Sequence, residues 1–543
     1  MAIKCNNCGG DMRYHIRDKI LKCEHCSEKI AVEEYDKISN PTQVNEEEYG
    51  YVEQMESSLY QCPECGAEIR CFDEEATIFC SYCGKQTFLK QKENSIRPIK
   101  IIPFQKTQSD LKKNYEKFIK GKFFVPKDLK NAEHLKEYRG VYIPCWNFSY
   151  ETDGEYKYNG VRNYTSGGYD YHETYEIDAK VEGDIEDITF DASATFDDTL
   201  SSAIAPYNME KAKPFHEGYC AGFYMDKETT VSDTYDGVAE IAISNNVREN
   251  IEDSEKGSRK IYITNCTEEP VYIKKKTELT LLPVWFMTYR NKDRVSYSVA
   301  NGQTGKMTMD VPVDKKSFFT KTSILAGILS IVFIILFSTI FHSMTATIIS
   351  YLSLVTLFIS SWMLCRQLKM INEKDNKTYD IGSGKATNID EIAKKQKKKS
   401  FNLAGSNNII KIVFYILFGI SMFGGLGITL AGGSGSTKPT FLTVLITVPL
   451  IIFQIIRIGK LKKWKIKNEP KIGIISLCIM ILGALMYLIS SPNDWLYYGL
   501  SALSVVGIAL NALGCINGFD YLTSRPVPNF FGREETKDET IYN

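Results

Sequence analysis

Apolar residues in the C-terminal part of the chain form long runs that polar residues seldom interrupt. Each run is long enough to cross the hydrocarbon core of a bilayer as a helix, which takes about 20 mostly apolar residues. The pattern therefore predicts six transmembrane helices within residues 319–520. The predicted spans are 323–341, 345–365, 412–431, 440–456, 472–490 and 495–514.

The charges of the loops between these spans orient the predicted bundle. Lysine and arginine crowd the loops after the second and fourth spans, whereas the three alternate loops share one cation, Lys438. By the positive-inside rule, both termini are cytoplasmic and residues 521–543 form a cytoplasmic tail of a multi-pass cell-membrane protein. The spans hold almost no ionisable residue. Because intramembrane charges usually mark ion or proton pathways, this pattern counts against a pump or coupled transporter.

Residues 140–318 alternate between apolar and polar positions, which predicts a mostly β (α+β) cytoplasmic domain. The segment 142–150 returns as the segment 281–289, with proline and tryptophan at matching positions. Two copies of a strand–turn–strand unit indicate an internal duplication, arranged around a pseudo-twofold axis. Trp146 and Trp285, which occupy the matching positions, are expected to be core anchors.

Two shorter regions connect the predicted domains. Residues 31–58 are acidic and polar, which is typical of a solvated linker. Residues 93–139 are rich in lysine and are expected to be a basic helical connector with an apolar stripe at helical spacing. This stripe consists of Leu111, Tyr115, Phe118 and Ile119. Helices are also expected over 206–216 and 235–251.

Two groups of four cysteines near the N-terminus share one spacing, in which fourteen residues separate two Cys-x-x-Cys pairs. Two thiolates that lie three positions apart in a tight turn can bind one metal ion. The repeated spacing is a signature of zinc sites. We expect zinc ribbon 1 in residues 1–30 and zinc ribbon 2 in residues 59–92, each with one structural Zn²⁺. The predicted ligands are Cys5, Cys8, Cys23, Cys26, Cys62, Cys65, Cys80 and Cys83.

The spacing leaves two alternatives open, which are a redox-active dithiol or disulfide pair and a four-cysteine site filled by iron. The start of the chain has no apolar stretch of a secretory signal, and the remaining cysteines are scattered, as expected in a reducing compartment. Net charge is −1, and both the linker between the ribbons and ribbon 2 itself are acidic. Nucleic-acid binding is therefore disfavoured, because it needs cationic surface beside the zinc sites.

Four short motifs follow the second ribbon in a fixed order. They are Ile102-Pro103-Phe104, Gly140 to Trp146, Leu282 to Trp285, and the turn-like Asn301-Gly-Gln-Thr-Gly-Lys306 before the first apolar span. Over roughly residues 60–320 the chain resembles a family of bacterial membrane proteins that carry a TFIIB-type zinc ribbon at the N-terminus. The resemblance implies an adaptor role, because family members often stand beside envelope-stress or membrane-scaffold proteins. This chain carries two ribbons rather than one.

No catalytic motif is recognised in the sequence, such as a nucleophile elbow or an HExxH pair. Four cysteines complete a zinc site and leave no position for a substrate. The sequence favours a non-enzymatic membrane adaptor or scaffold that holds a cytoplasmic protein-interaction surface at the lipid bilayer. The alternatives are a membrane-tethered nucleic-acid-binding or transcription-related protein, and a transporter-like bundle with a regulatory cytoplasmic half. The six histidines are His15, His25, His134, His172, His216 and His342.

Overall fold

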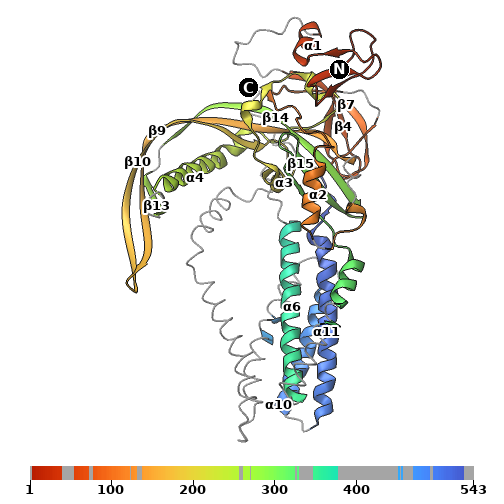
Figure 1. Ribbon diagram of the computed structural model, residues 1–543, viewed down its shortest axis with the longest axis vertical. Coiled ribbons are helices and arrows are strands. Elements are labelled where there is room, and N and C mark those ends of the chain that lie inside the picture. The colour runs from red at the N-terminus through yellow and green to blue at the C-terminus, as the bar shows by residue number, and fades with distance from the viewer. Residues whose placement is uncertain are drawn as a thin grey trace.

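The structure is a computed structural model in which a β-rich head lies at one end of a group of long helices (Figure 1). The head comprises the ribbons and the predicted β domain. The structure describes residues 3–39, 54–72, 77–122, 124–130, 137–255, 261–268, 271–324, 327–328, 346–376, 451–452, 454–455, 469–489 and 493–530.

The centre of the head is the antiparallel pair of strands β9 (Arg139–Ser166) and β14 (Tyr272–Asn291). These two strands carry the two copies of the repeated segment. Ile143 and Leu282 occupy the same position in the two copies, and they lie directly opposite each other in the strand pair. A pseudo-twofold axis between the copies produces this register, since equivalent residues face each other at the axis.

The same symmetry relates the elements beside the central pair. Strand β8 (Lys100–Ile101) pairs in parallel with β14, and strand β12 (Tyr224–Asp226) pairs in parallel with β9. Each short strand is followed by a helix, α2 (Lys112–Lys120) after β8 and α4 (Asp236–Glu255) after β12. The strand of one half therefore pairs with the long strand of the other half, so that the halves interleave.

The two matching tryptophans fasten each half to the other. The Trp146 indole N–H donates to the carbonyl of Thr230 at 2.7 Å, and the Trp285 indole N–H donates to the carbonyl of Lys106 at 2.7 Å. Trp285 is 6% exposed and packs in the main core cluster, as expected of a core anchor. Trp146 is half-buried at the edge of a second cluster.

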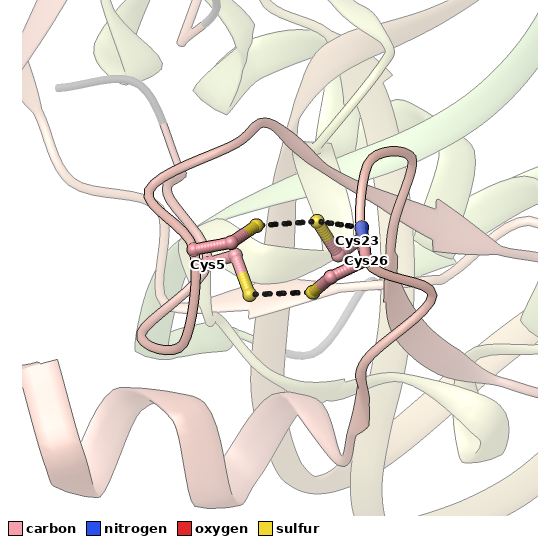
Figure 2. A group of neighbouring side chains, drawn as sticks. Cys5, Cys23 and Cys26 are labelled. Carbon is pink, nitrogen blue, oxygen red and sulfur yellow. Dashed lines mark hydrogen bonds between the residues drawn. The ribbon is translucent and has the colours of Figure 1, made fainter.

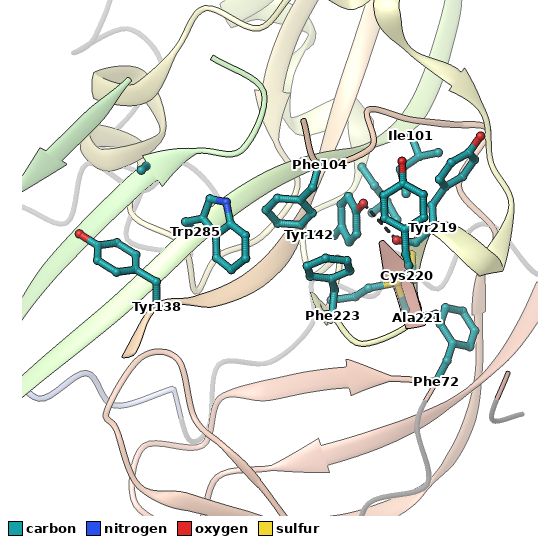
Figure 3. Packing of buried hydrophobic residues seen from close by; sticks show 14 of the residues in the cluster. Phe72, Ile101, Phe104, Tyr138, Tyr142, Tyr219, Cys220, Ala221, Phe223 and Trp285 are labelled. Atoms are coloured by element: carbon teal, nitrogen blue, oxygen red, sulfur yellow. Dashed lines mark hydrogen bonds between the residues drawn. The ribbon is translucent and has the colours of Figure 1, made fainter. Parts of the chain in front are cut away.

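Aromatic rings fill the space between the central sheet and ribbon 1 (Figure 3). Phe104 stacks on Phe223 with ring centroids 4.4 Å apart, and its ring also lies 4.9 Å from that of Trp285. Gly140 makes this packing feasible, because a Cβ at that position would lie 2.3 Å from Cδ1 of Phe223. The Ile-Pro-Phe motif and the start of β9 thus meet in one aromatic core.

Strand β9 and strand β10 (Tyr169–Asp191) extend from the head as a long hairpin, which we call the arm (Figure 1). Strand β13 (Tyr262–Glu268) pairs with β9, and helix α4 covers the apolar inner face of the arm. Tyr156, Tyr235 and Ile243 are buried in this contact. The hairpin of β14 and β15 (Arg294–Asn301) is much shorter.

Ribbon 2 belongs to the same sheet as the central strands, whereas ribbon 1 forms a small sheet of its own. The link is the pairing of β5 with β12, in which Arg70 stands opposite Met225. The elements of ribbon 1 are β1 (Met12–His15), β2 (Ile20–Cys23), β3 (Lys29–Ile30) and the following α1 (Val32–Ser39). Those of ribbon 2 are β4 (Gln54–Gln61), β5 (Glu68–Cys71), β6 (Thr77–Phe79) and β7 (Gln86–Ile96).

Long helices extend away from the head (Figure 1). Helices α6 (Ala346–Asn376) and α11 (Asp494–Leu522) are long and apolar enough to cross a bilayer, over Ile349–Ile371 and Asp494–Phe519. Helix α10 (Glu469–Ile489) has a shorter apolar stretch.

The described residues thus contain two helices that meet this length and composition, and not the six that the hydropathy pattern predicts. The predicted span 412–431 lies outside the described residues. Most residues of the predicted spans 323–341 and 440–456 also lie outside the described residues.

Helices α6 and α11 run parallel, with their C-terminal ends toward the head. Gln367 Nε2 donates to the carbonyl of Cys515 at 2.8 Å, and Asn511 Nδ2 donates to Ser360 Oγ at 2.9 Å. Farther from the head, a Cβ on Gly507 would meet Cδ1 of a leucine of α6, which shows how closely the helices approach.

After α11 the chain returns to the head as strand β17 (Arg525–Pro526), which pairs with β15. The Arg525 guanidinium makes ion pairs with Asp197 and Asp310 and lies 5.4 Å from the ring centroid of Tyr297. The last helix and the head are therefore joined through an ordered strand.

Of the two shorter helices expected from the sequence, the one over 235–251 is confirmed as α4. The region 206–216, expected to be a helix, contains a 3₁₀ turn (Met209–Lys211) and strand β11 (Lys213–Pro214), so that prediction is wrong. Pro214 contributes to the difference, because proline lacks the N–H that a helix interior needs. The predicted stripe lies on α2 and its N-cap residue Leu111, and Leu111, Tyr115 and Ile119 are buried.

We predict that Arg525→Gln loosens the joint between α11 and the head. The side chain is 16% exposed, and removing its charge leaves Asp310, itself 17% exposed, without this partner. The expected loss is about 3 kcal/mol of unfolding free energy, at the lower end of the scale for broken buried ion pairs because these groups are partly exposed. Thermal unfolding of the full chain in detergent measures it. Arg162→Gln, at an exposed ion pair of the arm, is the control and should change the melting temperature little.

Candidate metal centres

Each of the four cysteine pairs adopts the same tight turn. The carbonyl of the first cysteine accepts a backbone N–H from the residue four positions later, for example Gly66 N to Cys62 O at 2.8 Å. That later residue has a positive φ in every turn, which favours glycine because a Cβ is strained there. Three of the four positions are glycine. The four are Gly9 (φ 71°), Ser27 (φ 63°), Gly66 (φ 77°) and Gly84 (φ 71°).

The turns bring the eight predicted ligands together as two groups of four thiols, Cys5, Cys8, Cys23 and Cys26 in ribbon 1 and Cys62, Cys65, Cys80 and Cys83 in ribbon 2. All sulfur atoms within a group lie within 4.8 Å of one another. Figure 2 shows the ribbon 1 group.

The distances between the sulfurs fit a tetrahedral metal site. The Sγ atoms of Cys5 and Cys26 are 3.6 Å apart, and those of Cys65 and Cys80 are also 3.6 Å apart. Four sulfurs at the usual Zn–S length would lie about 3.8 Å from one another. A disulfide has an S–S length of about 2.05 Å, so these thiols are not paired as disulfides. The residues present therefore fit two structural zinc ions.

Hydrogen bonds within each group favour the thiolate form at Cys23 of ribbon 1 and at Cys62 of ribbon 2, whereas the pKa values of the Cys26 and Cys65 thiols are raised. In ribbon 1 the N–H of Cys26 donates to the sulfur of Cys23 and lowers the pKa of the Cys23 thiol to about 6. In ribbon 2 the hydrogen bond with Cys65 lowers the pKa of the Cys62 thiol well below its usual range. A thiolate is the form that binds a metal ion.

The two sites differ in burial. In ribbon 1, Cys5 and Cys23 are buried, but Cys8 and Cys26 are exposed. In ribbon 2 all four cysteines are buried. The second site is therefore part of the interior of the head, while the first lies at its surface.

Tyr82, which lies between the third and fourth ligands of ribbon 2, anchors that ribbon in the head. Its hydroxyl donates to the carboxylate of Asp226 on β12, which also accepts hydrogen bonds from Ser193 and Thr195. Burial raises the pKa of the Asp226 carboxyl to about 6, although these hydrogen bonds oppose the shift. The buried carboxyl thus joins ribbon 2 to both halves of the head.

Further contacts fasten both turns of ribbon 2. The Tyr297 hydroxyl donates to the carbonyl of Tyr82 at 2.9 Å, and the Thr288 hydroxyl donates to the carbonyl of Ser81. The backbone N–H of Phe530, in the segment after α11, donates to the carbonyl of Cys65 at 2.6 Å. The returning C-terminal segment therefore touches the metal site itself.

A network of ion pairs links the β12 region to ribbon 2. The nearly buried Lys227 lies 3.0 Å from Glu68 and 3.2 Å from Glu93. The buried Arg70 lies beside Glu93 and Glu228. Breaking one member of such a buried network leaves its partner's charge uncompensated, which is costly.

Ribbon 1 rests on the loop between β11 and β12. The Tyr14 N–H donates to the carbonyl of Ala221 at 3.1 Å, and the Tyr14 ring packs edge-on against Tyr219. Glu33 of α1 accepts from Lys213 at 3.0 Å and from the Tyr219 hydroxyl at 2.6 Å. These contacts hold the ribbon against the head without burying its outer turns.

The histidines do not form a catalytic group in the part of the chain that the structure describes. His15 lies 3.1 Å from Asp18 on the surface of ribbon 1, and His172 is hydrogen-bonded to the amide oxygen of Asn163 on the arm. Neither His15 nor His25 takes the place of a cysteine in the ribbon 1 group. His134 and His342 lie outside the described residues.

The segment Asn301 to Lys306 is a turn, as its composition predicts. Asn301 Oδ1 accepts the backbone N–H groups of Gln303 and Thr304 at 2.8 and 2.9 Å. The N–H of Gly305 donates to the carbonyl of Asn301 at 2.8 Å. These backbone donors are therefore used within the turn and are not available to a bound anion such as phosphate.

No family model and no solved structure matches the chain. An uncharacterised protein of Bacillus subtilis (strain 168), YdjG, is 26% identical to it over 332 residues. The matched region covers 60% of this chain and 94% of that protein.

We predict that the two metal sites contribute unequally to stability. Cys8→Ser and Cys62→Ser should each lower the bound zinc from two ions per chain to one, which elemental analysis of the purified full chain measures. Cys62→Ser should also lower the melting temperature by roughly 10 °C or more, because structural zinc contributes several kcal/mol and this site lies in the head's interior.

The Cys8→Ser change should lower the melting temperature far less, since it affects an exposed ligand at the surface. Cys478→Ser, which removes an exposed thiol of α10, is the matched control and should keep both zinc ions. Equal thermal losses in the two ribbon variants would contradict the unequal roles.

Proposed function

We propose that the chain is a non-enzymatic, zinc-stabilised membrane adaptor that presents a rigid cytoplasmic surface to a protein partner. In this proposal the apolar helices, six in all, anchor the chain in the cell membrane with both termini in the cytoplasm. The resemblance to bacterial TFIIB-type zinc-ribbon membrane proteins supports the same role, with an envelope-stress or membrane-scaffold protein as the expected kind of partner.

The observation that best supports the proposal is that one β-sheet connects the metal site of ribbon 2 to the segment after the last helix. Ribbon 2 joins the central sheet through β5 and β12, and the strand after α11 joins the same sheet through β15. A surface built on such a sheet keeps its position relative to the helices. That property suits a scaffold, whereas a flexible tether would let the head swing freely.

Polar groups within the helices support an anchoring role rather than a transport path. The Asn511 side chain is hydrogen-bonded to Ser360 and to Ser476, at 2.9 and 3.1 Å. Gln454 donates to Ser361 and Cys365. Interhelical hydrogen bonds of this kind stabilise helix packing in membranes.

The outer face of the arm is the surface that best fits a partner. Asp153 on β9 lies directly opposite Glu182 on β10, and the two carboxylates share a nearby cation, Lys180, which lies 3.2 Å from Glu182. Both side chains are exposed, as is Asp178 on the same face. In the described part of the chain β10 pairs with β9 alone, so its other edge can accept an added strand.

The acidic face selects for a cationic partner. It would repel nucleic acid, whose phosphates are negative, and it would attract a lysine- or arginine-rich segment of a protein. The same charges discourage pairing between two copies of the arm, because charged edges protect strands against self-association.

We predict that neutralising the acidic residues on the outer face of the arm abolishes binding of the protein partner. The variant Asp153→Asn/Asp178→Asn/Glu182→Gln and the intact chain are each captured from membranes in mild detergent, and their partners are identified by mass spectrometry. The intact chain should capture a protein partner, and the variant should capture at least about tenfold less of it. This loss is expected when opposite charges at an interface are removed. Direct binding of the purified partner then confirms the effect.

The matched control neutralises three acids of ribbon 1, with Asp18→Asn, Glu24→Gln and Glu34→Gln, and should keep the partner. A partner lost in this control and kept by the arm variant would move the docking surface to ribbon 1. If the intact chain binds no protein specifically, the adaptor proposal itself is wrong.

A further inference from the structure

A cavity of about 960 Å³ lies where the head meets the apolar helices. Its walls come from the head-facing ends of α6 and α11, from the chain after strand β16 (Met307–Met309), and from the end of α2. These segments are far apart in the sequence and converge at the level where the helices enter the head. The volume falls in the range of small-molecule sites, about 300–1,000 Å³.

The walls of the cavity are mainly apolar. Trp362 and Met363 line it from α6, and Phe519 lines it from α11. Val313 and Phe318 complete the lining from the segment that leaves the head. Met363 is 57% exposed and Phe519 is 45% exposed, so these apolar surfaces are not covered within the described part of the chain.

Two cations stand in the same lining, Arg366 on α6 and Lys122 after α2. Among the described residues Arg366 makes no ion pair, and Lys122 lies 5.0 Å from the ring centroid of Phe118. The acid in the lining, Asp310, is already engaged by Arg525 and by the backbone N–H of Tyr297. The polar part of the cavity is therefore left with uncompensated positive charge.

The polar side chains deeper in the cavity are satisfied by each other. Asn511, which lines the cavity, is hydrogen-bonded to Ser360 and Ser476 of the neighbouring helices. They need no partner from a bound molecule. A ligand that fits the whole cavity must carry negative charge at the cationic end and apolar groups along the helices.

We propose that this cavity binds one anionic phospholipid of the cytoplasmic leaflet. The phosphate of the headgroup is held by the guanidinium of Arg366 and the ammonium of Lys122, and the first part of an acyl chain lies against Trp362 and Phe519. Arginine suits this role because its planar guanidinium matches the geometry of a phosphate. Basic pockets between membrane helices on the cytoplasmic side are typical sites for anionic headgroups.

The inference rests on the membrane placement proposed above, which is checked first. The full chain must stay in the membrane fraction after extraction with alkaline carbonate. If carbonate releases the chain, the membrane placement is wrong and the proposed lipid site is wrong as well. If it stays and the lipid test below fails, the site alone is wrong and the anchored adaptor is untouched.

The binding test uses the full chain in a neutral detergent, titrated with dioleoylphosphatidylglycerol, with dioleoylphosphatidylcholine and with soluble glycerol phosphate. Native mass spectrometry and the melting temperature report binding. The phosphatidylglycerol should bind at least about tenfold more tightly than the phosphatidylcholine, and glycerol phosphate alone should not raise the melting temperature. Equal binding of the two lipids, or equal stabilisation by glycerol phosphate, would overturn the proposal.

Two kinds of variant test the location of the site. Arg366→Gln/Lys122→Gln removes both cations, and Ala512→Phe fills the cavity from α11 without changing its charge. Both should weaken phosphatidylglycerol binding at least about tenfold, since one removes the phosphate contacts and the other the space. The two variants change the site in different ways. If one of them fails to fold, the other still tests the location of the site.

The matched control is Lys369→Gln, which removes an exposed lysine of α6 outside the cavity lining. It should bind phosphatidylglycerol as the unmodified chain does. If the control loses as much affinity as Arg366→Gln/Lys122→Gln, the lipid responds to general surface charge and the assigned site is wrong. Undiminished binding in both cavity variants would overturn it as well.

Discussion

The antiparallel pairing of β9 with β14 is the constraint on which the rest of the head depends. With Ile143 opposite Leu282, each half places its short strand and its helix against the long strand of the other half. A shift of this register by one residue would turn every side chain of one strand to the other face of the sheet. It would also separate the Trp146 and Trp285 indoles from the carbonyls that they bind.

Both the metal site of ribbon 2 and the end of α11 are attached to this central pair. Ribbon 2 reaches it through β12, and the C-terminal segment reaches it through β15 and then contacts ribbon 2 at Cys65. The ribbons therefore have different roles. Ribbon 2 stabilises the interior of the head, while ribbon 1 is docked at the surface and keeps Cys8 and Cys26 exposed. The arm and the cavity at the helix ends are the surfaces of this framework that we propose as binding sites for partners.

The sequence predicted features that depend on local spacing. The cysteine pairs, the repeated segment and the stripe on α2 could be found because three- to nine-residue patterns define them. Features that join distant parts of the chain left no such signal. Tyr82 and Asp226 are 144 positions apart, and Arg525 and Asp197 are 328 positions apart, so neither pair could be matched without the fold. The helix expected over 206–216 does not form, and a 3₁₀ turn and strand β11 take its place because Pro214 removes a backbone N–H that a helix interior needs.

The central claim is that the metal site of ribbon 2 supports the sheet and, through it, the joint with the last helix. Hydrogen exchange of the full chain in detergent, followed by mass spectrometry before and after removal of zinc with a chelator, tests this claim most directly. The account predicts that amides of β12 and β17 lose protection together with those of ribbon 2. Loss of protection confined to the two ribbons, with β12 and β17 unchanged, would contradict it.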